Sequence, residues 1–248
     1  YDLEQKRLTD VDESSEVRYA MFSPAGDKVA YVKDNNLFVR NLAGGECVRV
    51  TEDGEWNHII NGMPDWVYEE EWGIDHAFCF SPDGKQIAFI SRGEVFVTAV
   101  DYATTKQITK TAESESSPSF GADNRTLAYA SERNGNWELY LAKIERDEEK
   151  NFPNATLIKE EMPLPSEKIE RSYPLFSPDG KELAFIQDRR KLMVMNLESK
   201  KVRQITDGTL WHSTGGRFDY AWSPDGKWFT LEFIGNKHDP YSDIGIVS

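Results

Sequence analysis

The stretch "FSPDGKQIAFI", residues 80–90, places an aromatic residue, a turn and a strand in direct succession. Pro presets the backbone for the second position of a turn, Asp bonds its own backbone, and Gly accepts a positive φ. The residues after the turn, 86–90, have the pattern of a strand. The sequence therefore predicts a tight reversal that leads from one strand into the next.

The same motif occurs five times, with Asp replaced or shifted in the looser copies. The copies begin at aromatic anchors, which are Phe22, Phe80, Phe120, Phe176 and Trp222. Their spacings are 58, 40, 56 and 46 residues, so the base period is a little over 40 residues with insertions. A blade of a β-propeller, with its four strands, takes roughly 40–50 residues.

Each copy continues as a meander, as the strand patterns at 94–98 and 106–109 indicate for the second one. We therefore predict an all-β fold, a β-propeller of four-stranded antiparallel blades. A β-sandwich with coincidental turns is the alternative, but sandwiches do not repeat one turn at a blade-like period. No long helical periodicity competes with this interpretation.

Residues 1–248 are expected to form a single β-propeller domain. Propellers close with about 4–8 blades, so five repeats fit either a complete ring or a portion of a larger one. The chain opens without Met, in a pattern typical of a strand end, which favours the portion. An insertion at 145–172, rich in charge and Pro, is expected to be an exposed excursion.

Composition and charge exclude several classes of protein. With 39% hydrophobic residues in 248, the chain can bury a large core. Acidic residues outnumber basic ones by 43 to 29, and the formal charge of -14 repels nucleic acid and anionic membrane surfaces alike. We therefore expect neither nucleic acid nor a membrane as partner. The two cysteines, Cys47 and Cys79, are too few for a disulfide framework and are expected to be plain buried thiols.

Catalytic and metal-binding motifs are not found. A serine hydrolase of the α/β type needs a Gly-x-Ser-x-Gly elbow, and the sequence has none. His212 precedes Ser213, but adjacency in sequence is not a catalytic triad. Asp239 and Asp243 lie in a stretch without the Gly and Glu of a calcium loop. The histidines are scattered without metal-ligand spacing: His58, His76, His212 and His238. We expect no catalytic residue, no metal and no cofactor in this chain.

The acidic stretch "DWVYEEE", residues 65–71, stands apart from the repeats and carries a resemblance to a known family. Together with "DNNLFVR" and "FSPDGKQIAF", it makes residues 1–90 resemble the propeller of the dipeptidyl peptidase IV family. The resemblance implies a short acidic helix near 66–72 that projects toward a catalytic domain. It also implies that Glu70 and Glu71 hold the free N-terminal ammonium of a substrate.

Two adjacent carboxylates suit that role, since they repel each other and a bound cation relieves the repulsion while donating charge-assisted hydrogen bonds. Trp66, Tyr68 and Glu69 would support the pair. The alternative is an exposed acidic helical turn anchored by Trp66 and Tyr68, because surface charge runs are usually solvated.

Residues 84–248 resemble a propeller of bacterial tricorn-type peptidases, through "YASERNGNWELYLAKI" and "FSPDGKELAFIQDRRKLMVMNLESKKVRQITDG". After Ile90 the sequence "SRGEVFV" departs from the dipeptidyl peptidase pattern. The substrate-contacting Arg that the resemblance implies would lie upstream of Tyr1. The two resemblances together leave a hybrid or engineered chain as an open interpretation.

The sequence favours the non-catalytic propeller of a serine exopeptidase, of the dipeptidyl peptidase IV or tricorn type, that gates and orients short peptides. It leaves open whether the chain belongs to an enzyme. The partners implied are short peptides with a free N-terminus and a hydrolase domain outside this chain, with an oligomer allowed. The resemblance suggests the bacterial periplasm. The alternative is a stand-alone or engineered TolB-like propeller that acts as a scaffold for a protein or peptide.

Overall fold

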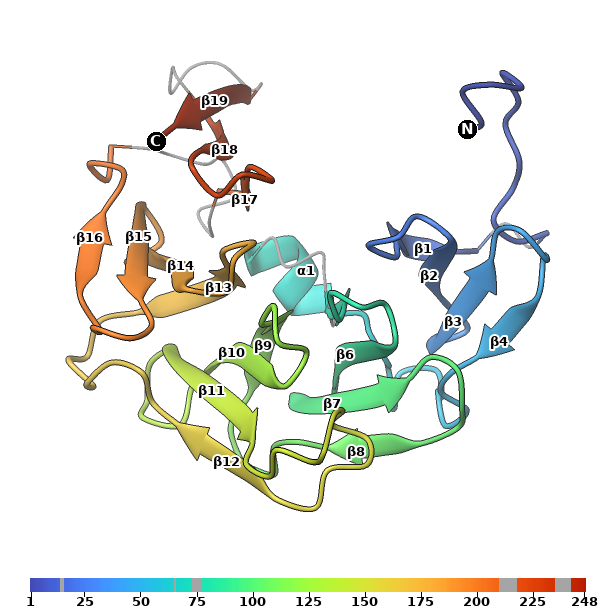
Figure 1. The fold of residues 1–248 in the computed structure, drawn as a ribbon, viewed down its shortest axis with the longest axis horizontal. Coiled ribbons are helices and arrows are strands. Elements are labelled where there is room, and N and C mark those ends of the chain that lie inside the picture. Colours follow the sequence, from blue (N-terminus) through green and yellow to red (C-terminus); the bar gives the residue numbers. More distant parts are fainter. Residues whose placement is uncertain (14–15, 65, 73–76, 210–217, 235–241) are drawn as a thin grey trace.

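The computed structural model describes residues 1–13, 16–64, 66–72, 77–209, 218–234 and 242–248, but not the side chains of Glu71 and Trp72. The chain forms five antiparallel sheets, which follow one another around an arc in sequence order (Figure 1). We call these sheets blades 1 to 5. The first and last blades lie at the two ends of the arc (Figure 1).

Blades 1 to 4 have four strands each, and blade 5 has three. Blade 1 consists of β1 (Arg18–Phe22), β2 (Lys28–Lys33), β3 (Asn36–Asn41) and β4 (Cys47–Arg49). Blade 2 consists of β5 (Phe78–Phe80), β6 (Gln86–Ser91), β7 (Glu94–Ala99) and β8 (Thr105–Gln107). Blade 3 consists of β9 (Glu115–Phe120), β10 (Thr126–Ser131), β11 (Glu138–Ile144) and β12 (Ile158–Glu161). Blade 4 consists of β13 (Arg171–Phe176), β14 (Glu182–Gln187), β15 (Lys191–Asn196) and β16 (Val202–Gln204). Blade 5 consists of β17 (Tyr220–Trp222), β18 (Phe229–Phe233) and β19 (Asp243–Val247).

The predicted five-bladed propeller of antiparallel meanders is confirmed. Every aromatic anchor is the last residue of the first strand of its blade. Strands β6 and β7 begin where the sequence predicted them, and β8 falls within two residues of the prediction. The predicted acidic helix is also confirmed, as α1 (Trp66–Trp72). Among the described residues, no helix has the length and apolar character that crossing a membrane requires.

The Ser-Pro-Asp-Gly turn has the hydrogen bonds that its residue types predict. In blade 2 the Ser81 hydroxyl donates to Asp83 Oδ1 at 2.6 Å and accepts from the Gln86 amide at 3.0 Å. Gly84 has a φ of 68° and donates its amide to the Ser81 carbonyl at 2.8 Å. Blades 4 and 5 repeat the Ser-to-Asp bond at 2.7 and 2.6 Å. The repeated motif therefore forms hydrogen bonds within the turn itself, and in blade 2 the Asp83 amide also donates to Asn124 Oδ1 of blade 3 at 3.0 Å.

The hydrophobic core lies between neighbouring blades. Blades 1 and 2, 2 and 3, 3 and 4, and 4 and 5 each share one apolar cluster. Eight residues after the anchor, blades 1 to 4 each have a fully buried alanine: Ala30, Ala88, Ala128 and Ala184. A small side chain at the middle of the blade lets adjacent sheets approach closely. Both faces of an inner blade are thus buried, which explains strands as apolar as "IAFI".

Blade 5 differs on the face that no other blade covers. Thr230 occupies the position of the buried alanines and is exposed, and Ile244 and Ile246 of β19 are 82% and 71% exposed. The opposite face of β18 packs Phe229 and Leu231 against blade 4. The end of the arc therefore has a core on one side only.

The insertion after blade 3's third strand is not the exposed excursion that the sequence predicted. Phe152 is fully buried and packs edge-on against Phe120, with ring centroids 6.0 Å apart. The Phe152 amide donates to Gln86 Oε1 at 2.8 Å, and Lys106 Nζ donates to the Ala155 carbonyl at 2.6 Å. The prediction of an exposed excursion is wrong because it rested on the charged and Pro-rich composition of the segment. That composition gave no sign that Phe152 packs blade 3 against blade 2.

The two cysteines differ in their exposure to solvent. Cys79 is half-buried within the cluster of blades 2 and 3, and burial raises the pKa of its thiol to about 12. Cys47 is exposed, so the prediction of a plain buried thiol is wrong for it. Its Sγ lies 3.1 Å from the Tyr31 hydroxyl, at the edge strand β4 of blade 1.

Candidate functional site

The segment that leads to α1 is positioned by blades 1 and 2. The Asn61 amide donates to the Asn35 carbonyl of blade 1 at 3.1 Å, and the Gly62 amide donates to the Ile90 carbonyl of blade 2 at 2.9 Å. Gly62 has a φ of 74°, and a Cβ there would lie 2.8 Å from Leu37 Cδ2. Glycine is required at this position because the backbone is left-handed and in close contact with blade 1.

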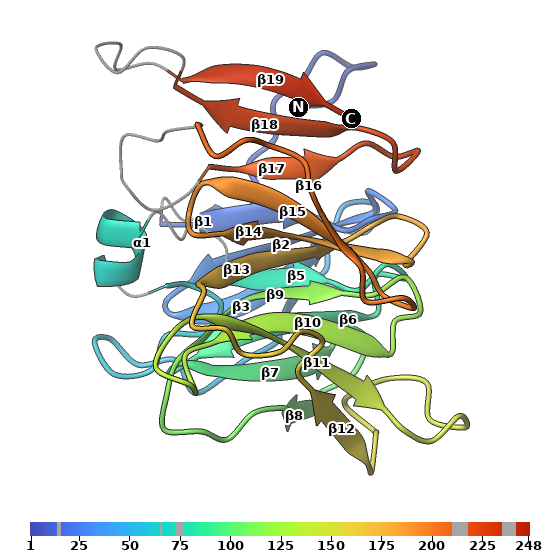
Figure 2. The same ribbon diagram turned by 90° about the vertical axis from the view of Figure 1, so that its left-hand side faces the viewer.

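Helix α1 stands on one face of the propeller. It lies near the middle of the arc in Figure 1 and projects from one side of the blades in Figure 2. The Tyr19 hydroxyl of β1 donates to Glu69 Oε1, so the helix is tied to the first strand of blade 1. Glu69 is half-buried and Glu70 is exposed. The side chain of Glu71, like the whole of Asp65, lies outside the described residues.

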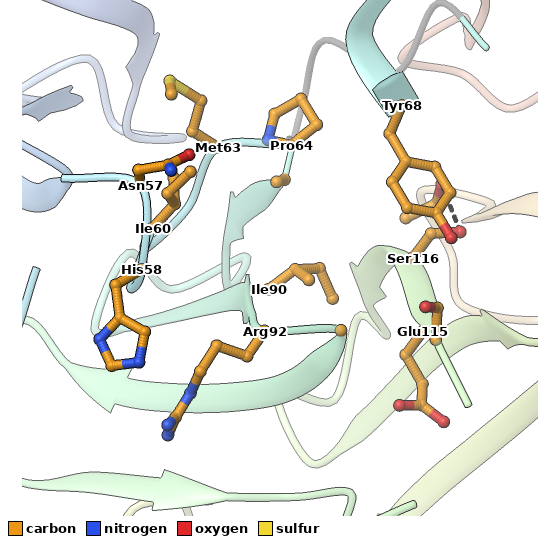
Figure 3. A pocket seen from close by; sticks show the side chains of 14 residues that line it. Asn57, His58, Ile60, Met63, Pro64, Tyr68, Ile90, Arg92, Glu115 and Ser116 are labelled. Carbon is orange, nitrogen blue, oxygen red and sulfur yellow. Dashed lines mark hydrogen bonds between the residues drawn. The ribbon is translucent and has the colours of Figure 1, made fainter. Parts of the chain in front are cut away.

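A pocket of about 380 Å³ opens beside this helix (Figure 3). It lies among the segment before α1, the helix itself, the β6–β7 turn and the start of β9. Its apolar wall consists of Ile60, Met63, Pro64, Ala77 and Ile90. Its polar residues are Asn57, His58, Tyr68, Arg92, Ser114, Glu115, Ser116 and Ser117. The pocket thus combines an apolar wall with a larger set of polar side chains that could orient a ligand.

Tyr68 and Arg92 lie at different ends of the pocket. In Figure 3 the side chain of Tyr68 descends from α1 toward Ser116, while Arg92 and His58 extend toward the opposite side. His58 Nδ1 lies 3.0 Å from Glu55 Oε2 in an exposed pair. Arg92 makes no hydrogen bond or ion pair within the part of the chain that the structure describes. The pocket thus has a basic end and an end formed by the helix.

The buried carboxyl of Glu115 turns away from Arg92 into blade 3. It accepts from Ser131 Oγ at 2.9 Å and from Thr111 Oγ1 at 3.0 Å, and it pairs with Arg133 Nε at 3.2 Å. Burial raises the pKa of Glu115, while these hydrogen bonds oppose the rise. Arg133 in turn stacks over the Tyr140 ring, 4.4 Å from its centroid, and pairs with Glu160. This network holds the start of β9, which forms one side of the pocket.

The candidate site residues from the sequence do not all lie in one site. Tyr68 lines the pocket and Glu69 ties down the helix. Trp66, expected to support the pair, is 69% exposed, so the Tyr19–Glu69 bond replaces it as an anchor. His76, His212, Ser213, His238 and Asp239 lie outside the described residues, and Asp243 begins β19. Where the structure describes the chain, no three His, Cys, Asp or Glu side chains are grouped to hold a metal ion.

Sequence reasoning missed Tyr19, Arg92 and Ser116. Arg92 and Ser116 belong to repeats two and three, and nothing local distinguishes them from other turn and strand residues. Tyr19 lies three residues before the first anchor, and its role depends on a helix 50 positions away. The departure of "SRGEVFV" from the dipeptidyl peptidase pattern was the one available signal for Arg92.

Comparisons with known proteins agree with this architecture. The family described as "Dipeptidyl peptidase IV (DPP IV) N-terminal region" matches residues 1–126. The probable dipeptidyl peptidase 4 of the fungus Trichophyton verrucosum is 32% identical over 221 residues, 84% of this chain and 27% of that protein. The chain therefore spans about a quarter of the length of this relative. An alignment of that length extends into both halves of the chain, which favours one family for the whole over a hybrid.

Two solved structures share the fold. Dipeptidyl peptidase 4 of Porphyromonas gingivalis aligns with a TM-score of 0.64 at 18% identity, covering 94% of this chain and 44% of that one. TolB of Acinetobacter baumannii aligns with a TM-score of 0.61 at 17% identity, covering 93% of this chain and 51% of that one. Likeness to tricorn-type peptidases and a bacterial source stay predictions.

Proposed function

The chain belongs to the dipeptidyl peptidase IV N-terminal family, and from this premise we propose that it gates and orients short peptides for a hydrolase domain outside it. In this proposal Glu70 and Glu71 bind the free N-terminal ammonium of the peptide. In this proposal the nucleophile belongs to the hydrolase domain. The propeller admits short unfolded chains to the pocket face and keeps folded ones out.

One observation carries the proposal: α1 supplies Tyr68 to the wall of the pocket and carries the exposed Glu70 two residues further on. The bond from Tyr19 to Glu69 uses the first glutamate of the three to hold the helix. The exposed Glu70 carboxylate is then available to a ligand. A protonated amine donates charge-assisted hydrogen bonds to such carboxylates, whereas an acetylated amine does not.

The test is calorimetric binding of the peptide Gly-Pro-Leu and its N-acetylated form to the chain. We expect Glu70→Gln combined with Glu71→Gln to weaken binding of the free amine about tenfold or more, because charge-assisted hydrogen bonds are lost. Acetylation should weaken binding to the wild type by a similar factor.

The matched control is Glu145→Gln combined with Glu148→Gln, which removes two exposed carboxylates after β11, away from the residues that line the pocket. It should bind like the wild type. Equal affinity of the Glu70/Glu71 variant and the wild type for the free amine would disprove the role of the pair. Binding of a stoichiometric folded partner instead of peptides would favour the scaffold hypothesis.

A further inference from the structure

The basic end of the pocket, where Arg92 and His58 lie, takes no part in the ammonium binding proposed above. Arg92 lies in the β6–β7 turn with a φ of 52°, and this left-handed backbone is uncommon for a residue other than Gly, Asn or Asp. It makes no hydrogen bond or ion pair in the described part of the chain, although the protein carries a formal charge of -14. Arg92 is exposed and lines the pocket, so its guanidinium can bind an anion there.

Neighbouring carboxylates do not neutralise Arg92. Glu94 Oε1 accepts from the Thr111 amide at 2.7 Å, and its other oxygen accepts from Thr109 Oγ1 at 2.5 Å. Glu115 is buried and paired with Arg133. At the rim, Glu55 is paired with His58. The carboxylates of Glu55, Glu94 and Glu115 therefore already have partners of their own.

The remaining polar groups at this end suit the same ligand. The Asn57 side chain also has no partner among the described residues and lines the pocket beside His58. At the other end of the pocket, beside Tyr68, Ser116 Oγ accepts a long hydrogen bond of 3.5 Å from Ser117 Oγ (Figure 3). The apolar wall of the pocket includes Ile60, Met63 and Ile90. The ligand thus needs an anionic group and an apolar body.

We propose that Arg92 binds a carboxylate of the bound peptide, opposite the end held by the glutamates of α1. This inference rests on the proposed peptide-binding function. It adds that the peptide carries a carboxylate as well as a free ammonium group. The carboxylate has two sources, the C-terminus of a very short peptide or an acidic side chain. In both cases the planar guanidinium donates two parallel hydrogen bonds to the carboxylate oxygens. Selectivity for zwitterionic or acidic peptides follows.

The experiment measures calorimetric affinity of the whole 248-residue chain for four peptides. These are Gly-Pro-Leu, its C-terminal amide, its N-acetylated form, and Gly-Pro-Asp amide, whose only carboxylate is a side chain. We expect Arg92→Gln to weaken binding of Gly-Pro-Leu about tenfold or more and to leave the binding of its amide unchanged. Arg92→Lys keeps the charge and should restore part of the affinity.

The control Lys85→Gln removes one positive charge from the same blade, in the turn at the opposite end of β6, where Lys85 is exposed. It should leave every affinity unchanged. Arg92→Asn is the second variant, because Asn tolerates a left-handed backbone and keeps the turn. A loss of Gly-Pro-Asp amide binding in Arg92→Gln identifies a side chain as a source, and a loss confined to the free acid identifies the C-terminus.

The inference fails if Arg92→Gln and Arg92→Asn both bind Gly-Pro-Leu and Gly-Pro-Asp amide like the wild type. It fails equally if the wild type binds Gly-Pro-Leu and Gly-Pro-Asp amide no more tightly than Gly-Pro-Leu amide, or binds none of them. If amidation matters and acetylation does not, Arg92 keeps its role while the glutamate pair loses its own. The two proposals are thus tested separately.

Discussion

Tyr19, Ser117 and Tyr173 have left-handed backbones, with φ of 54°, 54° and 56°. Each lies three residues before the anchor of its blade, where the pairing with the next strand shifts register. Such a bulge costs about 1–2 kcal/mol at a residue with a side chain and aims that side chain away from the pleat. Here the Tyr19 hydroxyl reaches Glu69 and Ser117 lines the pocket. The bulges could not be predicted from the sequence, because Tyr and Ser have no common preference for a left-handed backbone.

Glu115 makes stability depend on pH. Its folded pKa is raised above the ordinary 4.5 by burial, so its contribution is fully present below about pH 4.5 and is lost as pH rises through the folded value. We expect the free energy of unfolding of Glu115→Gln, measured in urea, to fall less than that of the wild type as pH rises above 4.5. Glu113→Gln changes an exposed carboxyl two positions away and should follow the wild type. Parallel pH profiles for Glu115→Gln and the wild type would contradict the assignment.

At the scale of elements, the repeat is predictable because each turn satisfies its own hydrogen bonds. Ser81, Asp83 and Gly84 form the same contacts as their counterparts in blades 4 and 5. Helix α1 was predictable only through a family resemblance, since seven residues carry too little periodicity. The loop after β11 was mispredicted, because its composition is polar while its one decisive residue is aromatic.

That aromatic residue gives a prediction for the loop. Phe152→Ala should lower the free energy of unfolding by about 3 kcal/mol, because it opens a cavity between blades 2 and 3 and removes the contact with Phe120. The matched control is Phe22→Ala, since Phe22 is 64% exposed and should change stability by less than about 1 kcal/mol. Chemical denaturation measures both. Equal effects of the two substitutions would show that the loop does not join the blades.

For the whole molecule, stability resides in the layers between blades. The alanine at the middle of each inner blade is completely buried, while Thr230 at the same position of blade 5 is exposed. Substitution to valine at this position of the repeat should therefore destabilise an inner blade and have little effect in blade 5. Position within the arc decides the result, and the local sequence does not.

We expect Ala128→Val to lower the free energy of unfolding by about 1–3 kcal/mol, because added methyl groups force blades 3 and 4 apart. Thr230→Val changes the same repeat position on an uncovered face and should alter stability by less than about 0.5 kcal/mol. Thermal and urea unfolding of the two variants provide the comparison. A large loss from Thr230→Val would mean that another surface covers blade 5.

The sequence by itself determined the blades, their period and their turns, because each depends on residues close together in the chain. The place of the acidic helix followed from a family resemblance carried by the sequence. Only the tertiary structure decided that Tyr68 and Arg92 line one pocket, that Glu69 is bound by Tyr19, and that Phe152 is buried. Each of these contacts joins segments from different blades. Their proximity arises from the packing of whole sheets against one another, and no local pattern encodes that distance.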